Sequence, residues 1–205
     1  MKLLAFRTFR PLAERKDAGK AVLAGMAGGL AGAWAMNCFS AAWERSTGQS
    51  PPPHSGMHAS RQEWDTTLNT ATVVARYVLH RRLREQQRER GAVAVHYAVA
   101  ASMGAGYAVL RELLPNTGGW PTLVAPGGAR PERQRRGATG WGSVSVGAAF
   151  GAALWLGAQE IGMPLLHLSG WPRQYSLLEQ AQSFGEHLAY GVTTELVRCA
   201  VRAMV

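Results

Sequence analysis

The 205-residue sequence has little cysteine and no recognisable catalytic signature. Its two cysteines, Cys38 and Cys199, are too few for a disulfide framework and lack the spacing of a zinc site. The motifs of zinc proteases, serine hydrolases and nucleotide-binding loops are also missing. We therefore predict a protein that is not an enzyme and that holds no cofactor and no metal.

Charge is missing from three long blocks of the sequence. Residues 21–43, 91–110 and 137–159 contain no Asp, Glu, Lys or Arg, although 17% of the chain is charged. A helix needs about 20 apolar residues to cross a hydrocarbon core of roughly 30 Å, and each block is long enough. The blocks predict three transmembrane helices in an all-α, polytopic membrane protein. The first apolar run is longer than that of a signal peptide, which favours an uncleaved span.

Acidic residues are outnumbered, with 13 Asp and Glu against 22 Lys and Arg. The arginines gather beside the predicted spans, at 81–90 and 133–136, and no nucleic-acid recognition motif accompanies them. Basic clusters next to a span attract anionic lipid headgroups. We predict contacts with membrane lipids, anionic headgroups in particular, and no binding of nucleic acid.

Glycine recurs at three- and four-residue spacing within the first and third predicted spans. This spacing gives one face of each helix a smooth surface on which a second backbone can approach closely. The partner helix is expected within the chain, in a second copy, or in another membrane protein. The predicted helix-packing positions are Gly25, Gly28, Gly29, Gly32, Gly147 and Gly151.

Two further helices are predicted in what we interpret as a single helical membrane domain, residues 1–205. Residues 64–90 carry an apolar stripe, which favours an amphipathic helix on the membrane surface over a solvated helix. Residues 177–205 predict a polar C-terminal helix that packs against the spans or is partly inserted. Residues 1–20 are expected to form a basic tail.

Proline and glycine mark the expected breaks between helices. The run Pro51-Pro52-Pro53 predicts an extended connector, and the segment 111–136 is expected to be irregular. The sequence Gly162-Met163-Pro164 predicts a break after the third span.

A series of motifs follows in order between Gly140 and Arg202. They are Trp155-Leu156, Glu160, Pro164-Leu165-Leu166, Trp171-Pro172, Glu179, Phe184-Gly185-Glu186-His187-Leu188 and Thr194-Glu195-Leu196-Val197-Arg198. This stretch resembles the YagU-like family of bacterial inner-membrane proteins. The resemblance implies a multi-pass inner-membrane location, no assigned enzyme activity and, for one member, an association with acid resistance. The inserted Glu186 and the arginine-rich segment 81–90 depart from the family pattern.

Ionisable residues within the predicted helices are the candidate functional groups: His96, Glu160, Glu186, His187, Glu195 and Arg198. A carboxylate and an imidazole inside a bundle can relay protons, because histidine titrates between about pH 5 and 8. Alternatively, Glu195 pairs with Arg198 or Arg202 and docks the C-terminal helix, while the histidines only support packing. The sequence leaves both interpretations open.

The sequence favours an integral inner-membrane protein that contributes to acid or proton stress resistance. Alternatives are a membrane scaffold or partner-binding subunit and a small oligomeric transporter or channel. An enzyme with haem or metal bound by His96, His167 and His187 is the least favoured. Basic residues before the first and third spans predict a cytoplasmic N-terminus, although the cluster at 81–90 conflicts with that orientation.

Overall fold

The computed structural model describes residues 15–48, 58–78, 80–113 and 141–204, and every regular element in these ranges is helical. The elements, in chain order, are α1 (Arg15–Thr47), α2 (Arg61–Tyr77), α3 (Glu85–Leu113), α4 (Trp141–Leu154), the π-helix η2 (Trp155–Gly162), α5 (Met163–Leu165), the 3-10 turn η3 (Pro172–Gln174) and α6 (Leu177–Met204). The prediction of an all-α fold is confirmed for the described residues.

Three helical segments are long and apolar enough to cross a membrane: Ala18–Thr47, Glu85–Leu113 and Gly142–Leu165. They correspond to the three charge-free blocks. The surface supports the same conclusion, since Leu23 and Trp34 of α1 are about two-thirds exposed. Polar side chains occupy the interior instead. Large apolar side chains outside and polar ones inside suit a chain surrounded by lipid.

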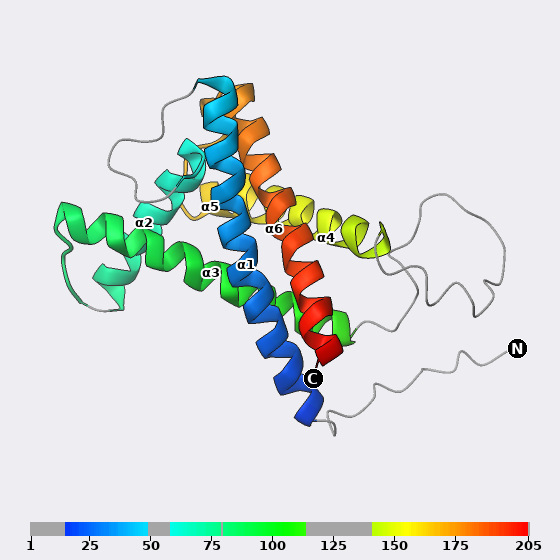
Figure 1. Cartoon of the computed structure of the whole chain (residues 1–205). Coiled ribbons are helices and arrows are strands. Elements are labelled where there is room, and N and C mark those ends of the chain that lie inside the picture. Colours follow the sequence, from blue (N-terminus) through cyan, green and yellow to red (C-terminus); the bar gives the residue numbers. More distant parts are fainter. Residues whose placement is uncertain (1–14, 49–57, 79, 114–140, 205) are drawn as a thin grey trace, which may run out of the picture.

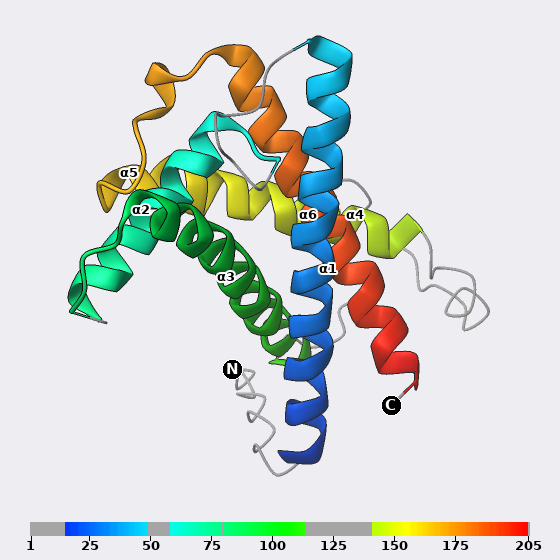
Figure 2. The ribbon, with the colours of Figure 1, turned by 60° about the vertical axis from the view of Figure 1, so that its left-hand side comes forward.

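Helices α1 and α6 lie side by side and run in opposite directions (Figures 1 and 2). Helix α3 packs on α1, and α4 packs on α6. The N-terminal end of α1 and the C-terminal ends of α3 and α6 lie at the same end of the molecule. Helix α2 lies across the N-terminal half of α3, away from the end of the molecule where the start of α1 and the ends of α3 and α6 lie.

Glycines make the helix crossings close. A Cβ added at Gly29 of α1 would overlap the backbone carbonyl of Ala100 on α3, so the two backbones touch. Gly25 faces α3 in the same way, whereas Gly28 and Gly32 face Thr194 and Tyr190 of α6. Gly147 and Gly151 of α4 lie against the backbone of α6 at Gly191 and His187. The six predicted packing glycines therefore all meet other helices of this chain.

The predicted single helix 64–90 is wrong in its extent. Helix α2 ends at Tyr77, His80 adopts a left-handed backbone conformation with φ of 51°, and α3 begins at Glu85. Residues 78–84, between the two helices, contain no glycine or proline from which this break could be predicted. Most of the apolar stripe is covered by protein, because Trp64 and Leu68 pack against α3 at Ala92, whereas Val78 at its end is exposed. Contact of this segment with a membrane surface stays a prediction.

Two other predicted boundaries need correction. The third span does not end at residue 159, because a π-helical segment continues it to Gly162 and α5 carries it to Leu165. Pro164 is tolerated there because it lies in the first turn of α5, where its missing N–H breaks no bond of a regular α-helix. The basic tail 1–20 is also shorter than predicted, since α1 begins at Arg15. The predicted connector at Pro51 and most of the segment 111–136 lie outside the described residues.

Candidate functional site: a buried carboxylate and histidine cluster

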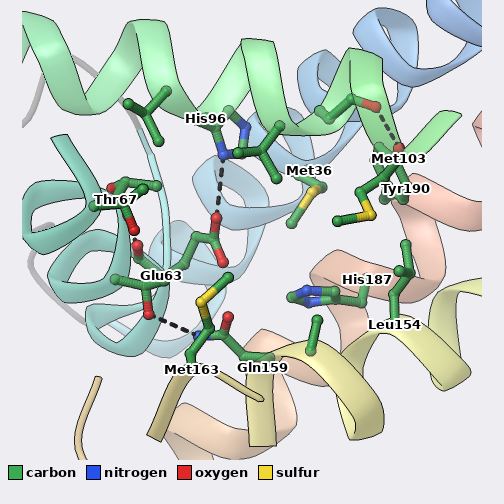
Figure 3. Close-up of a pocket in the computed structure, with 16 residues that line it drawn as sticks. Met36, Glu63, Thr67, His96, Met103, Leu154, Gln159, Met163, His187 and Tyr190 are labelled. Atoms are coloured by element: carbon green, nitrogen blue, oxygen red, sulfur yellow. Dashed lines mark hydrogen bonds and ion pairs between the residues drawn. The ribbon is translucent and has the colours of Figure 1, made fainter. Parts of the chain in front are cut away.

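A cavity of about 80 Å³ lies between α2, α3, η2 and α6 (Figure 3). Its polar lining includes Glu63, His96 and His187, which we call the cavity cluster. The lining contains no lysine or arginine among the described residues. One water molecule needs about 10 to 15 Å³ of such space, whereas pockets for organic ligands usually exceed 300 Å³. The cavity therefore suits a few water molecules rather than a metabolite.

Glu63 and His96 form the centre of the cluster. Glu63 stands in the first turn of α2, which Ser60 caps, and its Oε1 lies 3.2 Å from Nδ1 of His96 on α3. Burial alone would raise the pKa of the Glu63 carboxyl. The hydrogen bond from His96 and the charges of His96 and His187 outweigh burial and hold that pKa below its ordinary value. Glu63 therefore keeps its negative charge at neutral pH, and His96 Nδ1 is the donor.

His187 supplies a second imidazole from α6. Its Nδ1 lies 2.8 Å from the Ser183 carbonyl oxygen, which can only accept, so Nδ1 carries a proton and donates. In the neutral ring the other nitrogen, Nε2, is then an acceptor. Figure 3 shows the ring pointing into the cavity, opposite Glu63. His187 thus offers a basic nitrogen to the cavity.

The π-helical segment supplies the polar wall opposite α3. Gln159 donates to Thr66 Oγ1 at 3.2 Å, and Glu160 accepts from Gln62 Nε2 at 3.0 Å. The side chains of Gln159 and Glu160 are both buried. A π-helix widens the turn and redirects side chains, which is why such segments are common at functional sites. Here it turns two consecutive polar side chains towards α2.

A second buried carboxylate, Glu186 of α6, adjoins the cavity cluster. Its Oε1 accepts hydrogen bonds from Ser40 Oγ, from the Ser60 backbone N–H at 2.7 Å and from Gln182 Nε2 at 3.2 Å. Ser60 links the two groups, because its hydroxyl also accepts from the Glu63 backbone N–H at 3.4 Å. The residues therefore join α1, α2 and α6 at one junction.

Glu195 belongs to a separate network. Both of its carboxylate oxygens accept from Arg198, at 2.7 and 2.9 Å, and Tyr107 and Arg111 lie 3.0 and 3.6 Å away. His187 and Glu195 are eight residues apart, about 12 Å along a helix. Tyr190 and Phe150 pack in the intervening layer. The structure thus places His187 and Glu195 in different polar networks, and it pairs Glu195 with Arg198, as the docking interpretation requires.

Several site residues were not identified from the sequence. Glu63 lay just before the predicted helix 64–90, whereas Glu186 was named among the ionisable residues of the last helix without a predicted partner. The Ser60-x-x-Glu63 spacing is a helix-start signal that could have placed Glu63 in a first turn. Nothing in the sequence brings Ser40 of α1 to Glu186, since 146 residues separate them.

The described residues contain no group of three His, Cys, Asp or Glu side chains that could hold a metal ion. His167, the third histidine of the considered metal set, is exposed and does not line the cavity. The fold and the site together define a helical protein with three helices able to span a membrane and a polar interior. The chain matches no family model, and no curated protein or solved structure is significantly similar to it. The resemblance to the YagU-like family stays a prediction.

Proposed function

We propose that this chain is a non-enzymatic, multi-pass protein of the bacterial inner membrane that exchanges protons at the cavity cluster and thereby contributes to acid resistance. One observation supports the proposal above all. An ionised carboxylate, Glu63, is buried at 3.2 Å from one imidazole, and a second imidazole points into the same water-sized cavity. Imidazole gains and loses protons between about pH 5 and 8, so acidification would charge this cluster.

The orientation belongs to the same proposal. Lys20, Arg111, Arg198 and Arg202 lie near the helix ends that gather at one end of the molecule. Together with the basic residues before the first and third predicted spans, they favour a cytoplasmic location for that end and for the N-terminus, whereas the arginines at 81–90 lie near the start of α3, at the other end, and oppose it. Helix α6 runs back to this end beside α1, so we propose that it crosses the membrane as a fourth, polar helix. The exposed arginines at 81, 82 and 84 would then contact anionic headgroups of the opposite leaflet.

The alternatives have less support from the geometry. A scaffold assembled through the glycine faces is disfavoured, because those faces are covered by α3, α4 and α6 of the same chain. A transporter of organic solutes would need a larger cavity than about 80 Å³. Proton exchange needs only water and titratable side chains.

The proposal is tested in a deletion strain that carries the wild-type chain or a variant. Glu63→Gln and His187→Gln should remove the protection against acid challenge, because each takes a titratable group out of the cavity cluster. His167→Asn is the matched control, since His167 is exposed and lies outside the cavity, and it should protect like the wild type. Membrane levels of each variant are measured in parallel. Equal survival of the deletion strain and all complemented strains would refute the proposal.

A further inference from the structure

The two carboxylate oxygens of Glu186 are used unequally. Oε1 accepts three hydrogen bonds, from Ser40, Ser60 and Gln182. Oε2 is buried and has no hydrogen-bond partner among the described residues, in a side chain that is only 1% exposed. A buried carboxylate oxygen without a donor is costly, so this atom needs a positive partner or a proton.

Buried oxygens of Ser183 and Gln62, and Oε1 of Glu44, are also without a partner in the described part of the chain. Ser183 lies one turn before Glu186 on the same face of α6, and its Oγ makes no hydrogen bond. Ser183 differs in this from Thr66 of α2, whose hydroxyl donates to the backbone carbonyl four residues earlier. Gln62 is fully buried, with Nε2 engaged by Glu160 and Oε1 unpaired. Gln62 lies two residues after Ser60, whose backbone N–H donates to Glu186.

The charge around Glu186 is predominantly negative. The titratable groups around it are carboxylates and imidazoles: Glu44 of α1, paired with His58 at 2.7 Å, Glu63 of α2, paired with His96 of α3 at 3.2 Å, His187 next to it on α6, and Glu160 of η2. The arginines paired with carboxylates in the described residues, Arg111, Arg198 and Arg202, belong to the network at the other end of α6. The junction therefore combines unpaired acceptor oxygens with a carboxylate, Glu186, that accepts only neutral hydrogen bonds in the described residues.

We propose that the junction of α1, α2 and α6 binds a monovalent metal cation of the sodium class through Glu186 Oε2, Ser183 Oγ and Gln62 Oε1. Oxygen atoms alone suit hard cations, whereas copper or zinc would require sulfur or imidazole ligands. One carboxylate balances one positive charge, and the described residues hold no three-residue acidic or histidine set for a divalent ion. This inference deepens the proposed function, because the cation site adjoins the cavity cluster through Ser60, whose backbone N–H donates to Glu186 and whose hydroxyl accepts from the Glu63 backbone N–H.

The test uses the purified full chain in detergent. Its thermal unfolding is followed as sodium chloride replaces choline chloride at constant ionic strength, and binding of radioactive sodium is measured directly. The wild type should show saturable binding and a rising melting temperature.

Two variants and one control make the outcome decisive. Glu186→Gln and the milder Ser183→Ala should each weaken sodium binding about tenfold or more. Glu179→Gln should leave binding unchanged, because this capping carboxylate bonds only Ser176 at the start of α6 and glutamine can replace it there. Identical melting curves in sodium and choline for the wild type, or unchanged binding in Ser183→Ala, would overturn the cation site. Saturable sodium binding by the wild type together with equal survival of the deletion strain and all complemented strains would refute the proposed function and leave the cation site standing.

Discussion

Three buried glutamates differ in the groups that face their carboxylates, and each should respond differently to mutation. Glu195 faces the guanidinium of Arg198, with both carboxylate oxygens bonded. Glu63 faces the imidazole of His96. Glu186 accepts only neutral hydrogen bonds. A guanidinium stays charged at any pH that a protein tolerates, whereas an imidazole does not.

Glu63→Gln should destabilise the protein in a pH-dependent way. The pKa of Glu63 is lowered in the folded chain, so its carboxylate stabilises the fold above the unfolded value of about 4.3. That stabilisation is lost as the pH falls through the lowered folded pKa. We expect the variant to be about 1 to 3 kcal/mol less stable at pH 7, with a smaller difference near pH 4. Denaturant unfolding in detergent at both pH values measures this, and an equal loss at both would contradict the assigned ion pair.

Glu195→Gln should weaken the docking of α6. Breaking a buried carboxylate–guanidinium pair by removing one partner costs about 3 kcal/mol, because Arg198 is left buried without its counter-charge. The control is Glu112→Gln, whose pair with Arg202 at 3.0 Å is partly exposed and should be worth less than about 1 kcal/mol. Protease resistance of α6 and the unfolding free energy measure both. Similar losses of unfolding free energy in the two variants would contradict the argument that burial makes the Glu195–Arg198 pair worth more than the Glu112–Arg202 pair.

At the scale of whole helices, α1 is held between α3 and α6 by glycine contacts. Gly25 and Gly29 face one neighbour, and Gly28 and Gly32 face the other. Polar groups then join the ends of these helices, through Ser40 to Glu186 at one end and Glu195 to Arg111 at the other. Close backbone contact is a main source of helix association in lipid, so α1 is the element on which the bundle depends most.

Gly29→Ala tests this dependence. The added methyl group would overlap the Ala100 carbonyl, so α1 and α3 must separate, and we expect a loss of about 1 to 3 kcal/mol. Gly106→Ala on α3 is the matched control, because nothing lies within 4 Å of its added methyl group. Alanine favours a helix over glycine by about 1 kcal/mol, so the control should be neutral or stabilised. Thermal unfolding of the two variants measures this difference. An unchanged melting temperature of the Gly29→Ala variant would mean that α1 and α3 are not in close contact.

Helix boundaries show what local sequence could and could not predict. The spans were predictable because a lack of charge over 20 or more residues is a compositional property that needs no partner. The break between Tyr77 and Glu85 carries no glycine or proline, so only the packing of α2 on α3 explains it. The π-helix before Pro164 likewise depends on the polar contacts of Gln159 and Glu160 with α2.

At the scale of the whole molecule, both ends of the chain's helical part lie together. The start of α1 and the end of α6 are at one end of the bundle (Figures 1 and 2). We expect topology reporters fused before Met1 and after Val205 to report the same, cytoplasmic side, by the positive-inside rule. A reporter inserted after Gly48, where α1 ends, should report the opposite side. Termini on opposite sides would contradict four crossings by α1, α3, α4 and α6.

The sequence by itself determined that the chain is helical and that three of its helices can span a membrane, because length and hydropathy are local quantities. It also placed glycines where helices touch, since helical spacing fixes which residues share a face. Only the tertiary structure decided which polar groups meet. Glu63 reaches His96 across 33 residues, and Ser40 reaches Glu186 across 146. A buried charge needs a partner, but nothing in the order of residues along the chain says which distant helix supplies it.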